Sequence, residues 1–319
     1  MRTLSPEFMA ALGDSDGMLN PILARVHIDD TLDLEIRDDY INVYYRGGNL
    51  LKIDGPKKRY AVSFDVNYAQ DKHVMPSITK VLDSPSAVAD LIAVLPELKQ
   101  LMDFFFASHR SYEREYQQLI VRENNQAAVG KSSDYYICDI EYANSIPVDA
   151  KTRKFRFDMV AAHWPSISTS RKNGGMRRLV IVEVKYGDNA LRGSAGLKKH
   201  LEDVELFLSD DSVIEGFKTE MRQVFNQKRK LGLIKSNKDD LKELTSFSDE
   251  KPMLLLILAN HDPDSTILRD ELALLQVPDC FDLRFAMSNY MGYGLYDEAI
   301  VDMAGLKALS AERVCTKQP

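Results

Sequence analysis

The most apolar run in the chain, residues 179–185, ends in Glu-Val-Lys. A run of β-branched and aliphatic residues without alternation predicts a strand that is buried on both faces of a sheet. Because side chains alternate along a strand, Glu183 and Lys185 share one face and Val184 points to the other. An acid and a base inside a sheet are costly without partners, so this strand end predicts a site that holds a metal ion and a water.

A second strand carries another acid. Residues 155–160 are apolar apart from Arg156 and Asp158, and a polar, glycine-containing loop at 166–178 joins them to the first strand. Two neighbouring strands connected in this way bring Asp158 close to Glu183. Adjacent carboxylates repel each other unless a cation neutralises them. Oxygen ligands without thiols favour Mg²⁺ or Mn²⁺ over zinc.

Further periodic segments surround these two strands. The pattern predicts a helix at 110–124, strands near 134–142, 154–162, 178–186 and 253–259, and a helix near 195–208. It also predicts a long basic helix at 211–236 and an edge strand at 282–287. On the first helix, Glu113 and Glu115 flank the apolar side, and only one of them can face the strands. We favour Glu113, because it shares its side with Gln117 and Asn124.

The residues before this region have a different pattern. Residues 30–65 alternate around a turn at Gly47-Gly48, which predicts a β-meander with a tight hairpin. Two helices, 86–94 and 97–107, are expected to follow, separated by Pro96. The meander tyrosines Tyr40, Tyr44 and Tyr45 are expected to pack on a helix rather than stack on bases. We therefore divide the chain into an N-terminal unit at 1–105 and a second unit at 106–319.

Asp158 and Glu183-x-Lys185 together resemble the motif of the PD-(D/E)xK nuclease superfamily, which includes many restriction endonucleases. Phe157 stands where the family name has proline, a position that often varies in the superfamily. The element order helix, three strands, helix, strand is similar to the family core over roughly residues 106–290. The resemblance implies an α/β fold with a restriction-endonuclease-like mixed sheet flanked by helices, preceded here by the N-terminal β-rich element.

The resemblance also implies roles for the site residues. Asp158 and Glu183 would ligate Mg²⁺ or Mn²⁺, with the carbonyl of Val184 as a further ligand, and Lys185 would orient or deprotonate the attacking water. Glu113 would supply the acid of the preceding helix. Nucleic-acid contacts are expected from the residues Lys198 or Lys199 and Arg177 and Arg178.

The activity implied is a metal-dependent endonuclease that hydrolyses phosphodiester bonds, with DNA as the expected substrate, in restriction, repair or phage defence. The alternative is a catalytically silent module of the same fold that binds nucleic acid or a protein. A second copy of the chain is a further expected partner. Glu141 is expected to pair with Arg156 across neighbouring strands, with outer metal ligation as the other option.

Composition narrows the class of protein. The chain has 45% hydrophobic and 28% charged residues, which is typical of a soluble globular protein. No apolar run is long enough to span a membrane, and the cysteines Cys138, Cys280 and Cys315 show no paired spacing. We therefore expect free thiols and a cytoplasmic location. The net charge of −7 argues against a nucleic-acid-coating protein but allows basic clusters around one site.

Other catalytic motifs are absent from the sequence. Gly130-Lys131-Ser132 matches the end of a P-loop, but Asn125 stands where the loop needs its first glycine. The predicted helix before it and strand after it are also the reverse of the P-loop order. No His-Glu-x-x-His or Gly-x-Ser-x-Gly motif occurs.

Overall fold

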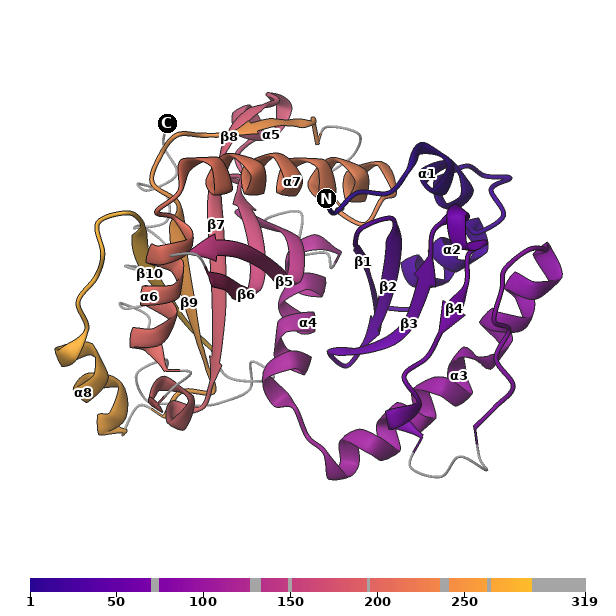
Figure 1. The fold of residues 1–319 in the computed structure, drawn as a ribbon, viewed down its shortest axis with the longest axis horizontal. Helices are drawn as coiled ribbons and strands as arrows, with labels where there is room; N and C mark the ends of the chain where they lie inside the picture. Colours follow the sequence, from indigo (N-terminus) through magenta and orange to yellow (C-terminus); the bar gives the residue numbers. More distant parts are fainter. Residues whose placement is uncertain are drawn as a thin grey trace, which may run out of the picture.

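The computed structural model describes residues 1–69, 75–126, 133–148, 151–193, 196–235, 241–262 and 265–288. Within them the chain forms a four-stranded antiparallel sheet and a mixed six-stranded sheet, both packed with helices (Figure 1). The predicted α/β class and the N-terminal β-rich element are confirmed. The P-loop-like tripeptide at 130–132, the aromatic stretch at 290–296 and Cys315 lie outside the described residues.

The N-terminal sheet is a meander in the order β1-β2-β3-β4. Its strands are β1 (Leu32–Ile36), β2 (Tyr40–Tyr45), β3 (Gly48–Asp54) and β4 (Val62–Ser63). The hairpin turn between β2 and β3 has positive φ at Arg46 and Gly47, as such a two-residue turn requires. A Cβ on Gly47 would also lie 2.3 Å from the main-chain carbonyl of Arg114, so this position needs glycine for two reasons.

The N-terminal sheet packs against helices that precede and follow its strands in the sequence. These are α1 (Pro6–Gly13), α2 (Asn20–Ile28) and α3 (Pro85–Ser108), with short 3-10 turns η1 (Pro56–Lys58) and η2 (Val66–Tyr68). The prediction of two helices separated by Pro96 is wrong, because α3 runs through this proline. Pro96 lacks one main-chain donor, but the buried stripe that includes Leu95 and Leu98 continues past it and holds the helix on the sheet. Tyr44 is buried, and the hydroxyl of Tyr45 donates a hydrogen bond to Asp103 of α3. Both observations agree with the prediction that these tyrosines pack within the protein.

The second sheet has the order β10-β9-β7-β6-β5, with β8 paired to the start of β7. Its strands are β5 (Tyr135–Val148), β6 (Lys151–His163), β7 (Gly175–Tyr186), β8 (Leu244–Phe247), β9 (Met253–Ala259) and β10 (Asp282–Ser288). The helices of this part are α4 (Tyr112–Asn125), α5 (Ser168–Lys172), η5 (Asp188–Leu191), α6 (Leu197–Phe207), α7 (Asp211–Lys230) and α8 (Thr266–Leu274). Apolar residues of α4 pack on one face of the sheet, and those of α6 and α7 belong to the core on the other.

Most of the predicted elements of this part are confirmed, β9 with the predicted bounds. The predicted helix at 211–236 ends earlier, at Lys230. α1, α2, α8 and β8 were not predicted from the sequence, and α5 lies in the segment predicted to be a loop. Among the described residues, no helix combines the length and the apolar character needed to cross a membrane. Cys138 and Cys280 are free thiols, as expected.

The sheet opens at the two predicted acids. β6 pairs with β7 only where Met159–His163 run against Arg178–Val182. One residue further in the same register, Asp158 would face Glu183, and there the two strands separate. β6 continues toward Lys151 paired with β5 alone, and β7 continues to Tyr186 paired with β9. Beyond this point the main chains of β6 and β7 do not hydrogen-bond to each other, which leaves room for side chains between the two strands.

Buried ion pairs join the N-terminal sheet to the second one. Lys228 of α7 bonds to Glu35 of β1 at 2.5 Å, and both side chains are buried. Arg37, just after β1, bonds to Asp139 of β5 at 2.5 Å. Burial opposes the charge of Lys228, but the adjacent Glu35 raises the pKa of its amine. Figure 1 shows α4 between the two sheets and α7 running along one end of both.

We expect Lys228→Met to lower the free energy of unfolding by about 3–5 kcal/mol, because it leaves the Glu35 carboxylate buried without its cation. Urea unfolding followed by the fluorescence of Trp164, which is buried in the core, measures this change. Lys230→Met, on the exposed side of the same helix, is the control and should have little effect. Glu35→Gln added to Lys228→Met should restore part of the loss. A Lys228→Met protein as stable as wild type would show that the pair does not hold the two sheets together.

Candidate functional site

The candidate site lies where β6 and β7 separate. Asp158 reaches across the gap, and its Oδ2 accepts a hydrogen bond of 2.8 Å from the main-chain N–H of Val184. The side chain of Asp158 thus takes the place of a main-chain acceptor on the strand that has turned away. Glu183 precedes Val184 and is only 1% exposed. The structure therefore brings the two acids together inside the sheet.

Neither acid is in an environment that favours its charged form. Burial and the nearby Glu183 carboxylate raise the pKa of Asp158 to about 8. Burial raises the pKa of Glu183 to about 7, although Lys185 opposes this effect. The two carboxyl groups also share a hydrogen bond when one of them is protonated. A proton or a cation between them relieves the repulsion.

His200 of α6 connects the acid to the base. Its Nδ1 lies 3.2 Å from Oε2 of Glu183, and its Nε2 lies 2.7 Å from Nζ of Lys185. Both contacts are satisfied when Lys185 donates to Nε2 and the Nδ1–H donates to Glu183. The sequence pattern predicted no role for His200. The sequence signal that could have identified His200 is its position on α6, directly after Lys198 and Lys199.

Glu113 of α4 approaches the same site from the other side. Burial and the charge of Asp158 raise the pKa of Glu113, while Lys185 and the main-chain N–H of Tyr186 counteract this. Glu115 instead pairs with Arg46 of the N-terminal hairpin, with 3.0 Å between Nε and Oε1. Of the two acids on this helix, Glu113 is thus the one directed at the candidate site.

The donor set suits a hard cation with few protein ligands. Oε2 of Glu183 faces His200, whereas Oε1 is buried and accepts no hydrogen bond within the described part of the chain. No group of three or more His, Cys, Asp or Glu side chains in that part is arranged to hold a metal ion. Two carboxylates remain, and Mg²⁺ commonly takes one or two carboxylates together with waters and substrate phosphates. Asp158 and Oε1 of Glu183 therefore fit Mg²⁺ or Mn²⁺ better than zinc. The further ligand expected, the carbonyl of Val184, stays a prediction.

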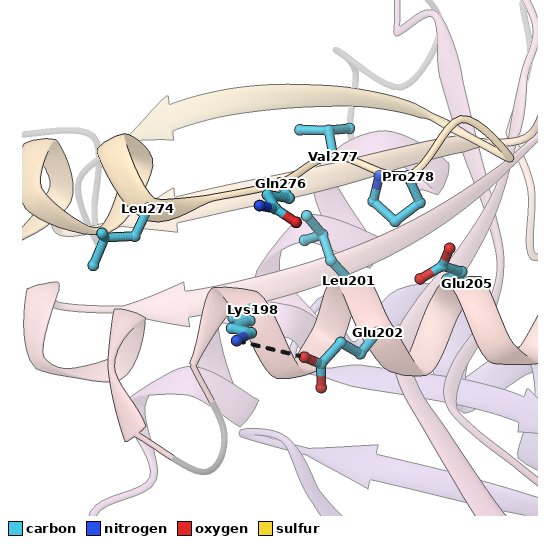
Figure 2. Close-up of a pocket in the computed structure, with 8 residues that line it drawn as sticks. All are labelled: Lys198, Leu201, Glu202, Glu205, Leu274, Gln276, Val277 and Pro278. Carbon is cyan, nitrogen blue, oxygen red and sulfur yellow. Dashed lines mark ion pairs between the residues drawn. The ribbon is translucent and has the colours of Figure 1, made fainter.

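The two lysines of α6 are not brought to this site. Lys198 pairs with Glu202 at 4.0 Å and lines a groove between α6 and residues 274–278, as Figure 2 shows. Lys199 pairs with Asp203 one turn along the helix. Because successive helical residues are about 100° apart, the side chain directed at the strands is His200 and not Lys198. Contacts of Lys198 and Lys199 with nucleic acid stay a prediction.

The two predicted arginines lie at the other end of β7. Arg177 stacks over Trp164, 4.0 Å from the ring centroid, and donates to the carbonyls of Ser170 and Asn173. Arg178 donates to the carbonyl of Lys251 and pairs with Asp282. At about 3.3 Å per residue, Arg178 is about 16 Å along the strand from Glu183. The structure gives both arginines partners within the protein, away from the acids.

The expected pair between Glu141 and Arg156 does not form. Arg156 lies opposite Ala143 in the β5–β6 register. Glu141 has a positive φ of 49°, and the hydroxyl of Tyr44 donates to it at 3.1 Å. Arg114 also lies 3.7 Å from its carboxylate. This strand irregularity, which alternation alone cannot show, turns Glu141 toward the N-terminal sheet and α4.

Metal-free protein should lose stability as the pH rises from about 4 to 8. The folded-state pKa values of Asp158 and Glu183, about 8 and 7, exceed the ordinary values of 3.8 and 4.5. Folding therefore binds protons in this range, and the resulting stability is fully present below pH 3.8 and is lost as the pH rises through the folded values. Asp158→Asn should melt above wild type at pH 8 in EDTA, and the two proteins should converge at pH 5.

Asp203→Asn provides a matched comparison. Asp203 is an ordinary ion-pair carboxylate, bonded to Arg153 at 2.8 Å, so its amidation should lower the melting temperature slightly at both pH values. If Asp158→Asn also melts below wild type at pH 8, Asp158 and Glu183 do not repel each other in the metal-free protein.

Comparison with known proteins does not assign the chain to a family. No family model matches the chain, and searches of the curated proteins and of the solved structures found no match to it.

Proposed function

We propose that this protein is a metal-dependent nuclease that hydrolyses phosphodiester bonds, with DNA as the favoured substrate. The observation that carries the proposal is a pair of acids, the half-buried Asp158 and the buried Glu183, beside Lys185 where two strands of the sheet separate. Two acids and a base inside a sheet lower its stability unless each has a partner. Such a group of ionisable side chains is therefore unusual in a purely structural sheet and indicates a functional site. The element order α4, β5, β6, β7, α6, β9 supports a restriction-endonuclease-like arrangement.

The side chains divide the proposed chemistry among themselves. A bound Mg²⁺ or Mn²⁺ would polarise the scissile phosphate and lower the pKa of a bound water. Asp158 and Oε1 of Glu183 would hold that ion. Lys185 would orient the attacking water, take part in its deprotonation and stabilise the charge that grows on the phosphate. His200 would keep Glu183 and Lys185 in their relative positions.

Glu113 completes the site from α4. Its half-buried carboxyl lies close enough to Asp158 and Lys185 to feel the charge of both. We propose that it holds a water on the α4 side of the ion. Restriction, repair and phage defence are the proposed settings, and the silent binding module is the reading to adopt if cleavage fails.

Lys185→Ala should reduce cleavage by roughly two to four orders of magnitude, the usual range for loss of a positioned proton-transfer group. Asp158→Ala should abolish the metal-dependent activity. Cleavage of supercoiled plasmid with Mg²⁺, Mn²⁺ or EDTA measures both effects. Lys58→Ala, which changes an exposed lysine of the N-terminal unit, should cleave like wild type. Cleavage by Asp158→Ala at the wild-type rate would exclude the proposed metal site.

His200→Ala should reduce cleavage by about 10- to 100-fold, because a side chain that orients a metal ligand typically has effects of this size. The Mn²⁺ concentration for half-maximal cleavage should rise as well, since Glu183 loses its partner at Oε2. His200→Gln retains one donor or acceptor on each side and should recover part of the activity. Equal activity of wild type and His200→Ala, at the same half-maximal Mn²⁺ concentration, would place His200 outside the site.

A further inference from the structure

A two-stranded arm leads away from the candidate site. It consists of residues 143–148 of β5 and 151–157 of β6, which pair with each other beyond the point where β7 leaves β6. One face of the arm is buried, because Phe155 and Phe157 pack against Phe207 of α6. The other face is exposed and carries Lys154 and Arg156, which alternate with these phenylalanines.

The exposed face of the arm has positive charge without a counter-charge. The residues opposite Arg156, Lys154 and Thr152 on β5 are Ala143, Ser145 and Pro147. All six are exposed, and none is acidic. Neither Lys154 nor Arg156 takes part in an ion pair within the described residues. Arg153 of the same strand is also exposed but differs from them, because it pairs with Asp203 of α6.

The position of this charge matters because the chain as a whole is acidic, with a net charge of −7. Two uncompensated cations on a surface otherwise free of charge attract an anion specifically to that surface. The main chain that presents the two cations is a paired strand, packed on Phe207 of α6 through Phe155 and Phe157, so it needs little ordering on binding.

The two cations lie on the strand that leads to Asp158. Lys154 and Arg156 are two residues apart on the exposed face of β6, so their side chains are about 6.7 Å apart. This spacing is comparable with that of successive phosphates on one nucleic-acid strand. Asp158, the group proposed to hold the metal ion, follows two residues after Arg156 on the same strand.

We propose that Lys154 and Arg156 bind successive backbone phosphates of the nucleic-acid strand that enters the site. This inference rests on the proposed function for its substrate class, and it adds the surface that positions the strand. The contacts are to the backbone, so they supply affinity without sequence preference. An acidic protein partner is the competing occupant, and the experiment distinguishes it.

Binding of fluorescein-labelled 20-nucleotide DNA, as duplex and as single strand, tests the proposal by anisotropy in EDTA, where no cleavage occurs. Lys154→Ala/Arg156→Ala should weaken binding roughly tenfold to a hundredfold. Since each phosphate contact contributes about 0.9 to the slope of log K against log salt for duplex DNA, that slope should fall by about 2. The charge-reversed K154E/R156E should bind more weakly still, and K154R/R156K should bind like wild type.

The control removes the same charge elsewhere. Lys57→Ala/Lys58→Ala changes two exposed lysines of η1 in the N-terminal unit and should leave the salt slope unchanged. Melting curves of every variant exclude unfolding as the cause. Equal salt slopes for the arm variant and wild type overturn the proposal, as does a wild-type protein that binds no nucleic acid.

Failure of the proposal and failure of the proposed function give different results. If wild type does not cleave but binds DNA through the arm, the catalytic assignment fails and the arm stands. If wild type cleaves and the arm variant keeps the wild-type affinity and salt slope, the catalytic assignment stands and the proposal for the arm fails. Retention of an acidic polypeptide such as poly-Glu, with no binding of DNA, overturns the nucleic-acid assignment.

Discussion

The repulsion between two neighbouring acids, the half-buried Asp158 and the buried Glu183, shapes this part of the protein. Asp158 and Glu183 occupy the first positions at which β6 and β7 do not pair, and the side chain of Asp158 bonds to the main chain of Val184 in place of the lost partner. A sheet under no other constraint would continue its ladder there with apolar residues. The opening provides the space, the low dielectric raises both pKa values, and only a proton or a cation satisfies the pair.

The elements around the opening supply what the acids need. α6 contributes His200, which bonds to the acid and the base of β7, and α4 contributes Glu113 from the other side. The arm of β5 and β6 extends from the same point with an exposed basic face. The N-terminal sheet takes part less directly, through the ion pairs that hold it to α7 and β5. Chemistry, positioning and support thus come from different segments that meet at one strand separation.

Sequence patterns could predict the strands of the second sheet apart from β8, and the two acids, because burial on both faces leaves an unbroken apolar run in which a charged residue stands out. They could not place His200, because its neighbours on α6 are also basic and only the rotation of the helix selects which one faces the strands. The continuous helix through Pro96 escaped prediction since tertiary packing overrides a local cost. Glu141 escaped because a positive φ in β5 breaks the alternation on which the expected pair depended.

Crystals grown with Mn²⁺ provide the most direct measurement, because the anomalous scattering of manganese locates the ion without assumptions about activity. We predict one strong anomalous peak within coordination distance of an Asp158 oxygen and Oε1 of Glu183, and no peak there in crystals of Asp158→Asn. An empty space between the two carboxyl groups at millimolar Mn²⁺, in wild-type crystals of good order, would contradict the proposed metal site. In that case the two acids share a proton, and the strand separation serves another purpose.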